Sequence, residues 1–314
     1  MVVAWGAAGC RDGAMKRIRV RLRLAVLIGL LQPISPSVAL ARPPVAHAAH
    51  PALWRLQNKD STIWLFGTIH ALPPHFEWED AAIRAAIAQS DRLVLEAVIE
   101  PEQSRNTLLR MAAATTPLPP VADRVPAKFH DALAAMAAKS GAPLAALNGM
   151  KTWAAAMVLF GVTVSGLGVT SADGVEEQLK AQFKMANKPV EGLETLEQQL
   201  GFFDTMDEAR QREFLVSVVD SHADDAADFG KMVGAWSHGD ERGISASFDK
   251  DMKTSDALRT VLLSRRNAHW ADALVRRLGM PGTQFIAVGA GHLTGPDSVQ
   301  VMLAKLGYRA KRVQ

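Results

Sequence analysis

The sequence predicts an α/β fold in which a central β-sheet is flanked by helices and carries a large helical insertion. Near each end of the chain, a short apolar segment (residues 62–66 and 284–288) runs into glycine and reaches a histidine three residues after that glycine. This pattern is typical of a buried strand that ends in a loop. The stretch between the two segments is rich in Ala, Leu and Met, which favours helices. Together these observations indicate strands at both ends and helices between them.

The first predicted elements are a β-hairpin, a helix and a strand. Segments 53–57 and 61–66 flank Asn58-Lys59-Asp60, whose residue types favour a tight turn. The Ala and Ile positions between Glu79 and Ser90 have helical spacing, and residues 92–96 form an apolar strand that ends in Glu96. This order is typical of the beginning of an α/β layered domain.

Residues 102–165 predict several short helices, among them 127–139 and 151–164. The apolar stripe of Trp153, Met157 and Phe160 is interpreted as core packing. The glycine-containing stretch 161–168 is expected to be a flexible break.

The later elements complete one domain. They are, in order, a helix over 173–186, a short strand with a loop over 188–194, a helix from 196 to 203, helices between 207 and 279, a strand over 283–288, a helix over 298–306 and an edge-like strand over 308–313. No low-complexity linker interrupts them, so we expect a single domain over 53–314 that follows a spacer over 42–52.

Residues 1–41 are expected to be a secretory signal peptide. Basic residues precede an apolar run from Leu24 to Leu31, and Ala39-Leu40-Ala41 predicts cleavage after Ala41. An uncleaved anchor is disfavoured because the run is shorter than the roughly 20 residues that span a bilayer. Met15 is also a more natural start for this leader than Met1. We therefore expect a periplasmic or secreted protein without a stable membrane anchor.

The composition argues against nucleic-acid binding. Of the 35 basic and 32 acidic residues, six basic residues and one acidic residue lie in the leader, so the mature chain carries a formal charge of about −2. The only cysteine, Cys10, lies in the leader as well. The mature chain therefore has no disulfides and no thiolate chemistry.

His70 and His292 are the first candidate site residues. The carboxyl ends of strands in open α/β sheets face the crevice where ligands bind, so we expect the two imidazoles to converge. A single histidine at a strand end is more often a structural hydrogen-bonding group, but the repeated pattern favours a shared site. Gly67 and Gly289 would allow a sharp turn or a close approach to a ligand.

Three charged residues are further candidates. Glu96 ends an apolar strand, where a carboxylate is costly unless it is paired or bound to a metal; the alternative is that it lies just beyond, in water. For Glu194 two interpretations are equally good: a functional role, or a structural role as a helix cap or first-turn acid. For Arg266, in a helix rich in basic residues, a solvated face is the default interpretation. Glu176 begins a helix, and the helix dipole alone explains an acid there.

Several motifs, taken in order, resemble the TraB/GumN family, which is related to the Tiki proteases and to the pheromone-shutdown protein PrgY. They are WLFGTIH at 64–70, LVLE at 93–96, KPVEGLET at 188–195 with QQL at 198–200, RN at 266–267 and VGAGHL at 288–293. The resemblance covers about residues 53–313. It implies a metal-dependent peptidase or hydrolase that uses manganese or cobalt.

The resemblance also implies a set of functional residues. They are His70, His292, Glu96 and Arg266, with Glu194 as a further candidate. This chain departs from many relatives in one respect, because Gly174-Val175-Glu176 stands where they have a G-V-D motif.

The resulting hypothesis is that His70, His292 and Glu96 hold a divalent cation that lowers the pKa of a bound water and polarises a peptide carbonyl. Mixed imidazole and carboxylate ligation suits manganese, cobalt or zinc rather than calcium. Glu194 would be the general base, and Arg266 would stabilise an oxyanion or orient a carboxylate.

The main alternative is a protein that binds a peptide or another ligand in the same cleft without turnover. Haem is disfavoured because its ligation in related folds uses tyrosine, and the only tyrosine here, Tyr308, is expected in the terminal strand. An accessory role in envelope polysaccharide export rests only on the family's association.

Overall fold

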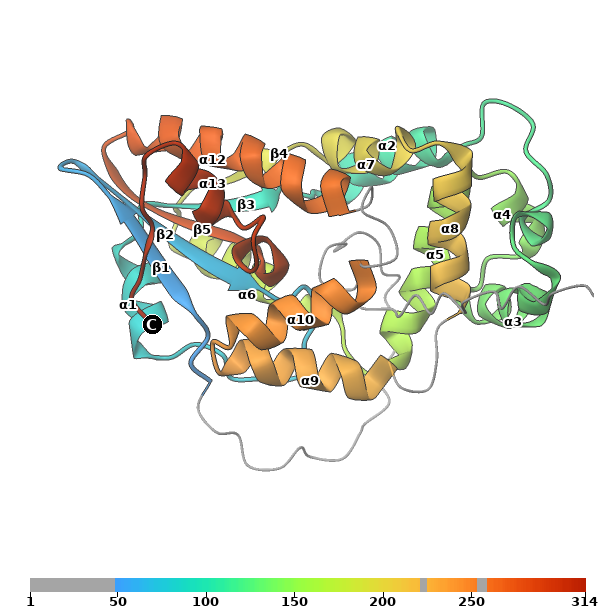
Figure 1. Cartoon of the computed structure of the whole chain (residues 1–314), viewed down its shortest axis with the longest axis horizontal. Coiled ribbons are helices and arrows are strands. Elements are labelled where there is room, and N and C mark those ends of the chain that lie inside the picture. The colour runs from blue at the N-terminus through green and yellow to red at the C-terminus, as the bar shows by residue number, and fades with distance from the viewer. Residues whose placement is uncertain (1–48, 221–224, 253–258) are drawn as a thin grey trace, which may run out of the picture.

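A computed structural model describes residues 49–220, 225–252 and 259–314, which form a mixed six-stranded sheet with helices on both faces (Figure 1). The α/β prediction is confirmed. The predicted signal peptide and residues 42–48 of the spacer lie outside the described residues. Within the described ranges, no helix has the length and apolarity that a membrane crossing requires.

The strand order of the sheet is β4-β3-β5-β2-β1-β6. The strands are β1 (Leu53–Gln57), β2 (Ser61–Thr68), β3 (Arg92–Ala97), β4 (Val190–Glu194), β5 (Gly282–Gly289) and β6 (Lys311–Arg312). β4, β3, β5 and β2 are parallel. At one edge of the sheet, β1 pairs antiparallel with β2, and β6 pairs antiparallel with β1. The carboxyl ends of the four parallel strands therefore meet at one edge of the sheet, where ligand sites of such sheets lie.

The predicted hairpin is confirmed. The side-chain oxygen of Asn58 accepts hydrogen bonds from the backbone N–H groups of Asp60 (2.9 Å) and Ser61 (2.8 Å), which closes the turn. β2 then pairs with β5 along its whole length, and Thr68 stands opposite Gly289. Both glycine-to-histidine segments therefore begin side by side.

Alternating side chains of the strands pack on two sides of the sheet, as the period of two requires. Leu65 belongs to the apolar cluster under α12 (Arg265–Leu278) and α13 (Val299–Lys305). Its neighbour Phe66 belongs to the larger cluster that includes α1 (Ala81–Gln89) and α6 (Val175–Met185). Burial of both faces fixes the register of β2.

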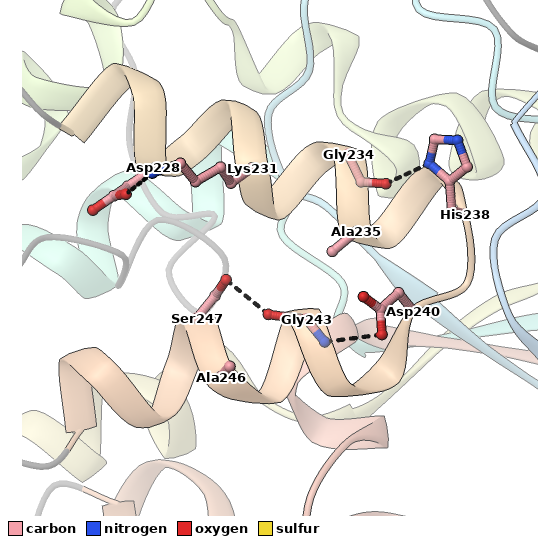
Figure 2. A pocket seen from close by; sticks show the side chains of 9 residues that line it. All are labelled: Asp228, Lys231, Gly234, Ala235, His238, Asp240, Gly243, Ala246 and Ser247. Atoms are coloured by element: carbon pink, nitrogen blue, oxygen red, sulfur yellow. Dashed lines mark hydrogen bonds and ion pairs between the residues drawn. The ribbon is translucent and has the colours of Figure 1, made fainter.

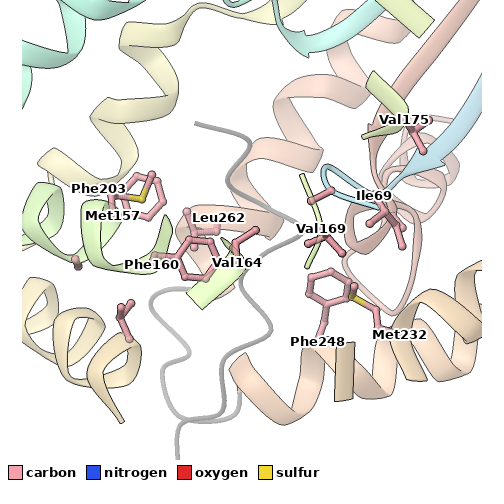
Figure 3. Packing of buried hydrophobic residues seen from close by; sticks show 14 of the residues in the cluster. Ile69, Met157, Phe160, Val164, Val169, Val175, Phe203, Met232, Phe248 and Leu262 are labelled. Carbon is pink, nitrogen blue, oxygen red and sulfur yellow. The ribbon is translucent and has the colours of Figure 1, made fainter. Parts of the chain in front are cut away.

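The insertion between the strands is helical and lies at one end of the molecule (Figure 1). Its helices are α2 (Pro101–Ala112), α3 (His130–Ser140), α4 (Leu144–Asn148), α5 (Thr152–Gly166), α7 (Leu196–Asp204) and α8 (Glu208–Val219). The predicted stripe on α5 is buried in the core, where Figure 3 shows Met157 and Phe160. The third member, Trp153, stacks its ring on Phe203 with centroids 6.2 Å apart.

The expected break at 161–168 is wrong over most of its length, because α5 continues to Gly166. Val164 of this stretch is buried, so the helix gains core contacts that outweigh the roughly 1 kcal/mol cost of a glycine in a helix. The turn comes at Gly168, whose φ of 68° lies in the left-handed region. The last strand is also shorter than predicted, since only Lys311–Arg312 pairs with β1.

A pair of helices, α9 (Asp225–Ser237) and α10 (Glu241–Met252), packs over the ends of β2 and β5. The indole N–H of Trp236 donates to the carbonyl oxygen of Gly67 at 2.7 Å. The ring of Phe248 lies so close to Gly291 that an added Cβ would stand 2.7 Å from it. This pair of helices therefore holds both glycine-to-histidine segments in place.

Candidate functional site

The two histidines converge at the carboxyl ends of β2 and β5. His70 follows β2 by two residues, and His292 lies in a 3₁₀ turn, Ala290–Leu293, directly after β5. Gly67 permits this close approach because a Cβ there would stand 3.0 Å from the Cα of Ala290. His70 is near enough that its charge influences the titration of both Glu96 and His292.

The imidazole of His292 is fully buried and held in one orientation. Asn267 on α12 donates through Nδ2 to the backbone oxygen of Asp297 at 2.7 Å, which leaves its Oδ1 to face Nδ1 of His292 at 2.6 Å. An amide oxygen only accepts, so Nδ1 carries the proton and Nε2 keeps its lone pair. The unprotonated nitrogen of His292 therefore lies between Nη1 of Arg266, at 3.3 Å, and Oε1 of Glu96, at 3.7 Å.

His70 is held in the same manner by an acid from α6. Its Nδ1 lies 2.6 Å from Oε1 of Glu176, and the hydroxyl of Thr68 donates to the same oxygen. Nε2 of His70 is buried and has no partner among the described residues. Both histidines thus have Nδ1 bound to an oxygen and Nε2 left as a potential ligand, the arrangement of metal-binding histidines.

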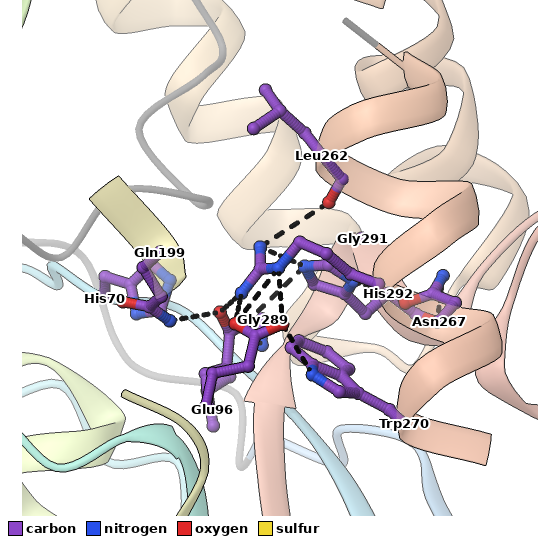
Figure 4. A network of polar contacts seen from close by, with 12 residues as sticks. His70, Glu96, Gln199, Leu262, Asn267, Trp270, Gly289, Gly291 and His292 are labelled. Atoms are coloured by element: carbon purple, nitrogen blue, oxygen red, sulfur yellow. Dashed lines mark hydrogen bonds and ion pairs between the residues drawn. The ribbon is translucent and has the colours of Figure 1, made fainter. Parts of the chain in front are cut away.

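Glu96, His292 and Trp270 lie close together in the site (Figure 4), and Arg266 joins its acidic residues. Its Nη2 donates to Glu96 and to Glu194, both at 2.7 Å, and its Nε donates to Glu194 at 3.1 Å. Its Nη1 lies 3.3 Å from Nε2 of His292 and 3.5 Å from the carbonyl oxygen of Leu262. All five N–H groups of the guanidinium therefore face an acceptor.

Aromatic rings fix Arg266 further. Its guanidinium carbon lies 4.6 Å from the ring centroid of Trp270 and 5.2 Å from that of Phe202. Only 3% of Arg266 is exposed, so the solvated-face interpretation is wrong for this residue, whereas the adjacent Arg265 is exposed.

The two glutamates are also buried. Glu96 is 6% exposed and accepts a hydrogen bond from the backbone N–H of Gly289 at 2.7 Å, so it does not lie in water. Glu194 ends β4, and the cap of α7 is the next residue, Thr195. Glu194 is therefore neither the helix cap nor a first-turn acid, and its Oε1 instead accepts a hydrogen bond from Trp270 at 2.8 Å.

The environment shifts the pKa values of these groups. Burial alone would raise the pKa of Glu96, but the charges of Arg266, His292 and His70 outweigh it and hold the pKa at about 2. Burial lowers the pKa of His292 to about 3, so this imidazole is neutral at physiological pH. Burial opposes the charge of Arg266 as well, but Glu96 and Glu194 raise its pKa above the ordinary value.

His70 responds in the opposite direction from His292. Burial lowers the pKa of His70, yet the charge and the hydrogen bond of Glu176 outweigh burial and raise it above the ordinary value. The charge of Glu96 adds to this effect. With both histidines neutral, the site holds three carboxylates and one guanidinium, so it attracts positive charge: Glu96 and Glu194 pair with Arg266, and Glu176 contacts His70.

The imidazole and carboxylate groups of the site suit a divalent cation such as manganese, cobalt or zinc, although they are not arranged as the ligands of one. The described residues contain no group of three or more His, Cys, Asp or Glu side chains arranged as metal ligands. The orphaned Nε2 of His70, the lone pair of His292 and Glu96 nevertheless form a mixed imidazole and carboxylate set. If an ion were bound, Nε2 of His292 and Oε1 of Glu96, which lie 3.7 Å apart, would be two of the atoms that hold it.

The structure thus places all five predicted residues in one neighbourhood and adds a partner for three of them. Of these partners, Glu176 was noted in the sequence as a first-turn acid and at the G-V-D position, and Asn267 and Trp270 were not proposed as site residues. Glu176 binds His70, Asn267 binds His292, and Trp270 binds Glu194. The helical spacing was a usable signal, because Trp270 follows Arg266 by four residues and Asn267 by three, and residues at these spacings share a helix face.

A groove between α9 and α10 is a separate feature (Figure 2). None of the predicted site residues lines it. Two of its polar side chains bind backbone groups of the helices themselves. Asp240 accepts from the backbone N–H of Gly243, and Nδ1 of His238 contacts the carbonyl oxygen of Gly234.

Comparison with known proteins identifies a family. The sequence model of the TraB/PrgY/gumN family matches residues 52–312, which is most of the chain. Comparison with curated proteins and with solved structures gives no match. The matched range contains both glycine-to-histidine segments, Glu96, Glu194 and Arg266. The chain therefore belongs to the TraB/PrgY/gumN family.

Proposed function

We propose that the protein is an exported metal-dependent hydrolase, with His70, His292 and Glu96 as ligands of one divalent cation and peptides as substrates. The observation that carries this proposal is the matched orientation of the two buried imidazoles. Each has its Nδ1 bound to an oxygen. Nε2 of His70 has no partner among the described residues, and Nε2 of His292 lies 3.3 Å from Nη1 of Arg266 and 3.7 Å from Oε1 of Glu96. The peptide substrate class rests on the resemblance to the Tiki proteases.

When bound, such a cation supplies Lewis-acid polarisation of a carbonyl group and a water of lowered pKa. Manganese and cobalt are the expected ions, and zinc also suits the ligands. We assign Arg266 to orienting the carboxylate of Glu96, because it is a fixed cation in a buried site and donates to that carboxylate at 2.7 Å. The oxyanion role expected from the sequence would require one of its N–H groups to leave its present acceptor.

The contacts of Glu194 favour a positioning role over the general-base role expected from the sequence. A general base needs a free lone pair within hydrogen-bond reach of the proton that it accepts. Both oxygens of Glu194 accept hydrogen bonds from Arg266, and one also accepts from Trp270. We therefore assign Glu194 to holding Arg266 against Glu96.

Metal analysis tests the ligand set. Protein purified without chelator should contain about one divalent ion per chain by inductively coupled plasma mass spectrometry. His70→Ala and His292→Ala should each weaken binding by more than the roughly 10–100-fold that loss of a supporting partner costs. His269→Ala is the matched control, because this histidine is exposed on α12. A metal-free wild-type protein whose His70→Ala variant keeps full activity would refute the proposal.

Turnover is tested separately, by incubation with a mixed peptide library and manganese. New peptide amino termini that disappear with chelator would support a hydrolase. Peptides retained intact by the protein would instead support the alternative, a binding protein without turnover, and would contradict the hydrolase.

Export is tested on the amino terminus of the mature protein. If residues 1–41 are a signal peptide, the mature chain recovered from the periplasm or the medium should begin at Arg42. Intact-mass measurement of secreted or envelope protein checks this. A chain that keeps its leader and stays in the cytoplasm would contradict export and leave the metal site untouched.

A further inference from the structure

The contact between His70 and Glu176 links two parts of the chain whose partnership the sequence did not reveal. Nδ1 of His70 and Oε1 of Glu176 are 2.6 Å apart, and the side chains are only 12% and 14% exposed. Thr68 donates its hydroxyl to the same carboxylate oxygen. A carboxylate only accepts hydrogen bonds, so the imidazole must present N–H at Nδ1.

The backbone makes this contact a fixed one. The N–H of Val175 donates to the carbonyl oxygen of Ile69 at 3.1 Å, one residue before each partner. Gly174 lies directly against the His70 carbonyl group, where a Cβ would stand 2.1 Å from the oxygen. The first turn of α6 and the residues after β2 therefore move as a unit, and Glu176 cannot drift away from His70.

We propose that Glu176 is the positioning residue of His70, and that its carboxylate selects the Nδ1–H tautomer and leaves Nε2 free for the site. The consequence for metal binding rests on the proposed function. The tautomer itself does not, because it is a property of the metal-free chain.

Two further observations separate this role from simple stabilisation of α6. Helix-dipole stabilisation needs only an acid near the amino terminus, and Glu177 already supplies one in the same turn. Glu177, whose side chain is 49% exposed, pairs with Lys180 at 2.6 Å, whereas the ion pair of Glu176 is with His70. Of these two adjacent glutamates, Glu177 therefore makes an ion pair away from the site, and Glu176 makes one with a residue of the site.

The test uses the full mature chain without metal, with ¹⁵N-labelled histidine. Long-range ¹H–¹⁵N correlation spectra, recorded at a pH where His70 is neutral, report which ring nitrogen carries the proton. Wild type should show Nδ1–H at His70, and Glu176→Met should shift the population toward Nε2–H. Glu176→Gln should preserve Nδ1–H because the amide oxygen still accepts. The matched control, Glu177→Met, should leave the spectrum of His70 unchanged.

Metal affinity gives a second measurement. Glu176→Met should raise the dissociation constant for manganese by about 10–100-fold, the usual effect of losing the acceptor behind a metal-binding histidine. Glu177→Met should have no such effect.

The outcomes distinguish this inference from the hydrolase proposal. Nε2–H at His70 in wild type would overturn the inference without any variant, so it stays testable even if Glu176→Met does not fold. Retention of Nδ1–H in a folded Glu176→Met variant would overturn it as well. A chain that binds no metal yet shows the Glu176-dependent tautomer would refute the hydrolase and support the positioning role.

Discussion

Replacement of Arg266 by methionine is expected to lower the free energy of unfolding by about 3–5 kcal/mol, the cost of removing one partner from a buried ion pair. The guanidinium is 3% exposed and donates to both Glu96 and Glu194 at 2.7 Å. Without it, two buried carboxylates lose the cation that compensates them. Methionine fills much of the same volume, so the loss reports charge rather than a cavity. Urea unfolding, monitored by circular dichroism, measures the change.

The control for this experiment is the neighbouring arginine. Arg265 is exposed, so Arg265→Met should change the free energy of unfolding by no more than about 0.5 kcal/mol. Adding Glu96→Gln to Arg266→Met should recover part of the loss, because one of the two uncompensated carboxylates is then neutral. An Arg266→Met protein as stable as wild type would show that the guanidinium does not compensate Glu96 and Glu194.

Much of the sheet was predictable from local patterns. The hairpin, α1, β3 and β5 follow from apolar segments bounded by turn residues or helical spacing, and all of them appear close to their predicted positions. The failures have tertiary causes. α5 continues past Gly161 because Val164 reaches the core, and β6 is short because only two residues find a partner on β1.

The site was predictable to the extent that sheet geometry dictates it. Residues 70, 96, 194 and 292 all lie at or just beyond the carboxyl ends of parallel strands, so their meeting follows from strand direction. The burial of Arg266 was not readable in this way, because a helix with many basic residues normally turns them to solvent. Its position becomes clear only when the two carboxylates that surround it are seen in space.

The relation between Glu176 and His70 was hidden for a different reason. An acid in the first turn of a helix has a sufficient local explanation in the helix dipole, so nothing in the sequence called for a distant partner. The contact depends on how α6 packs against the end of β2. Gly174 decides that packing, and its role is testable.

Gly174→Ala is expected to lower the free energy of unfolding by about 3 kcal/mol, at the upper end of the usual cost of overpacking. A Cβ at this position would stand 2.1 Å from the carbonyl oxygen of His70 and 2.7 Å from its carbonyl carbon. Both are backbone atoms, which cannot rotate away as a side chain would. The first turn of α6 must therefore separate from the residues after β2, and Glu176 must withdraw from His70.

The same substitution at Gly201 provides a control of opposite sign. Gly201 lies inside α7, and a Cβ there meets nothing within 4 Å, so Gly201→Ala should raise the free energy of unfolding by about 0.5–1 kcal/mol. Urea unfolding measures both variants. If Gly174→Ala proved as stable as wild type, the segment that carries Glu176 could shift at little cost, and the fixed contact with His70 would be contradicted. A large loss at Gly174 beside a gain at Gly201 would instead show that α6 is held against β2 by a contact that only glycine allows.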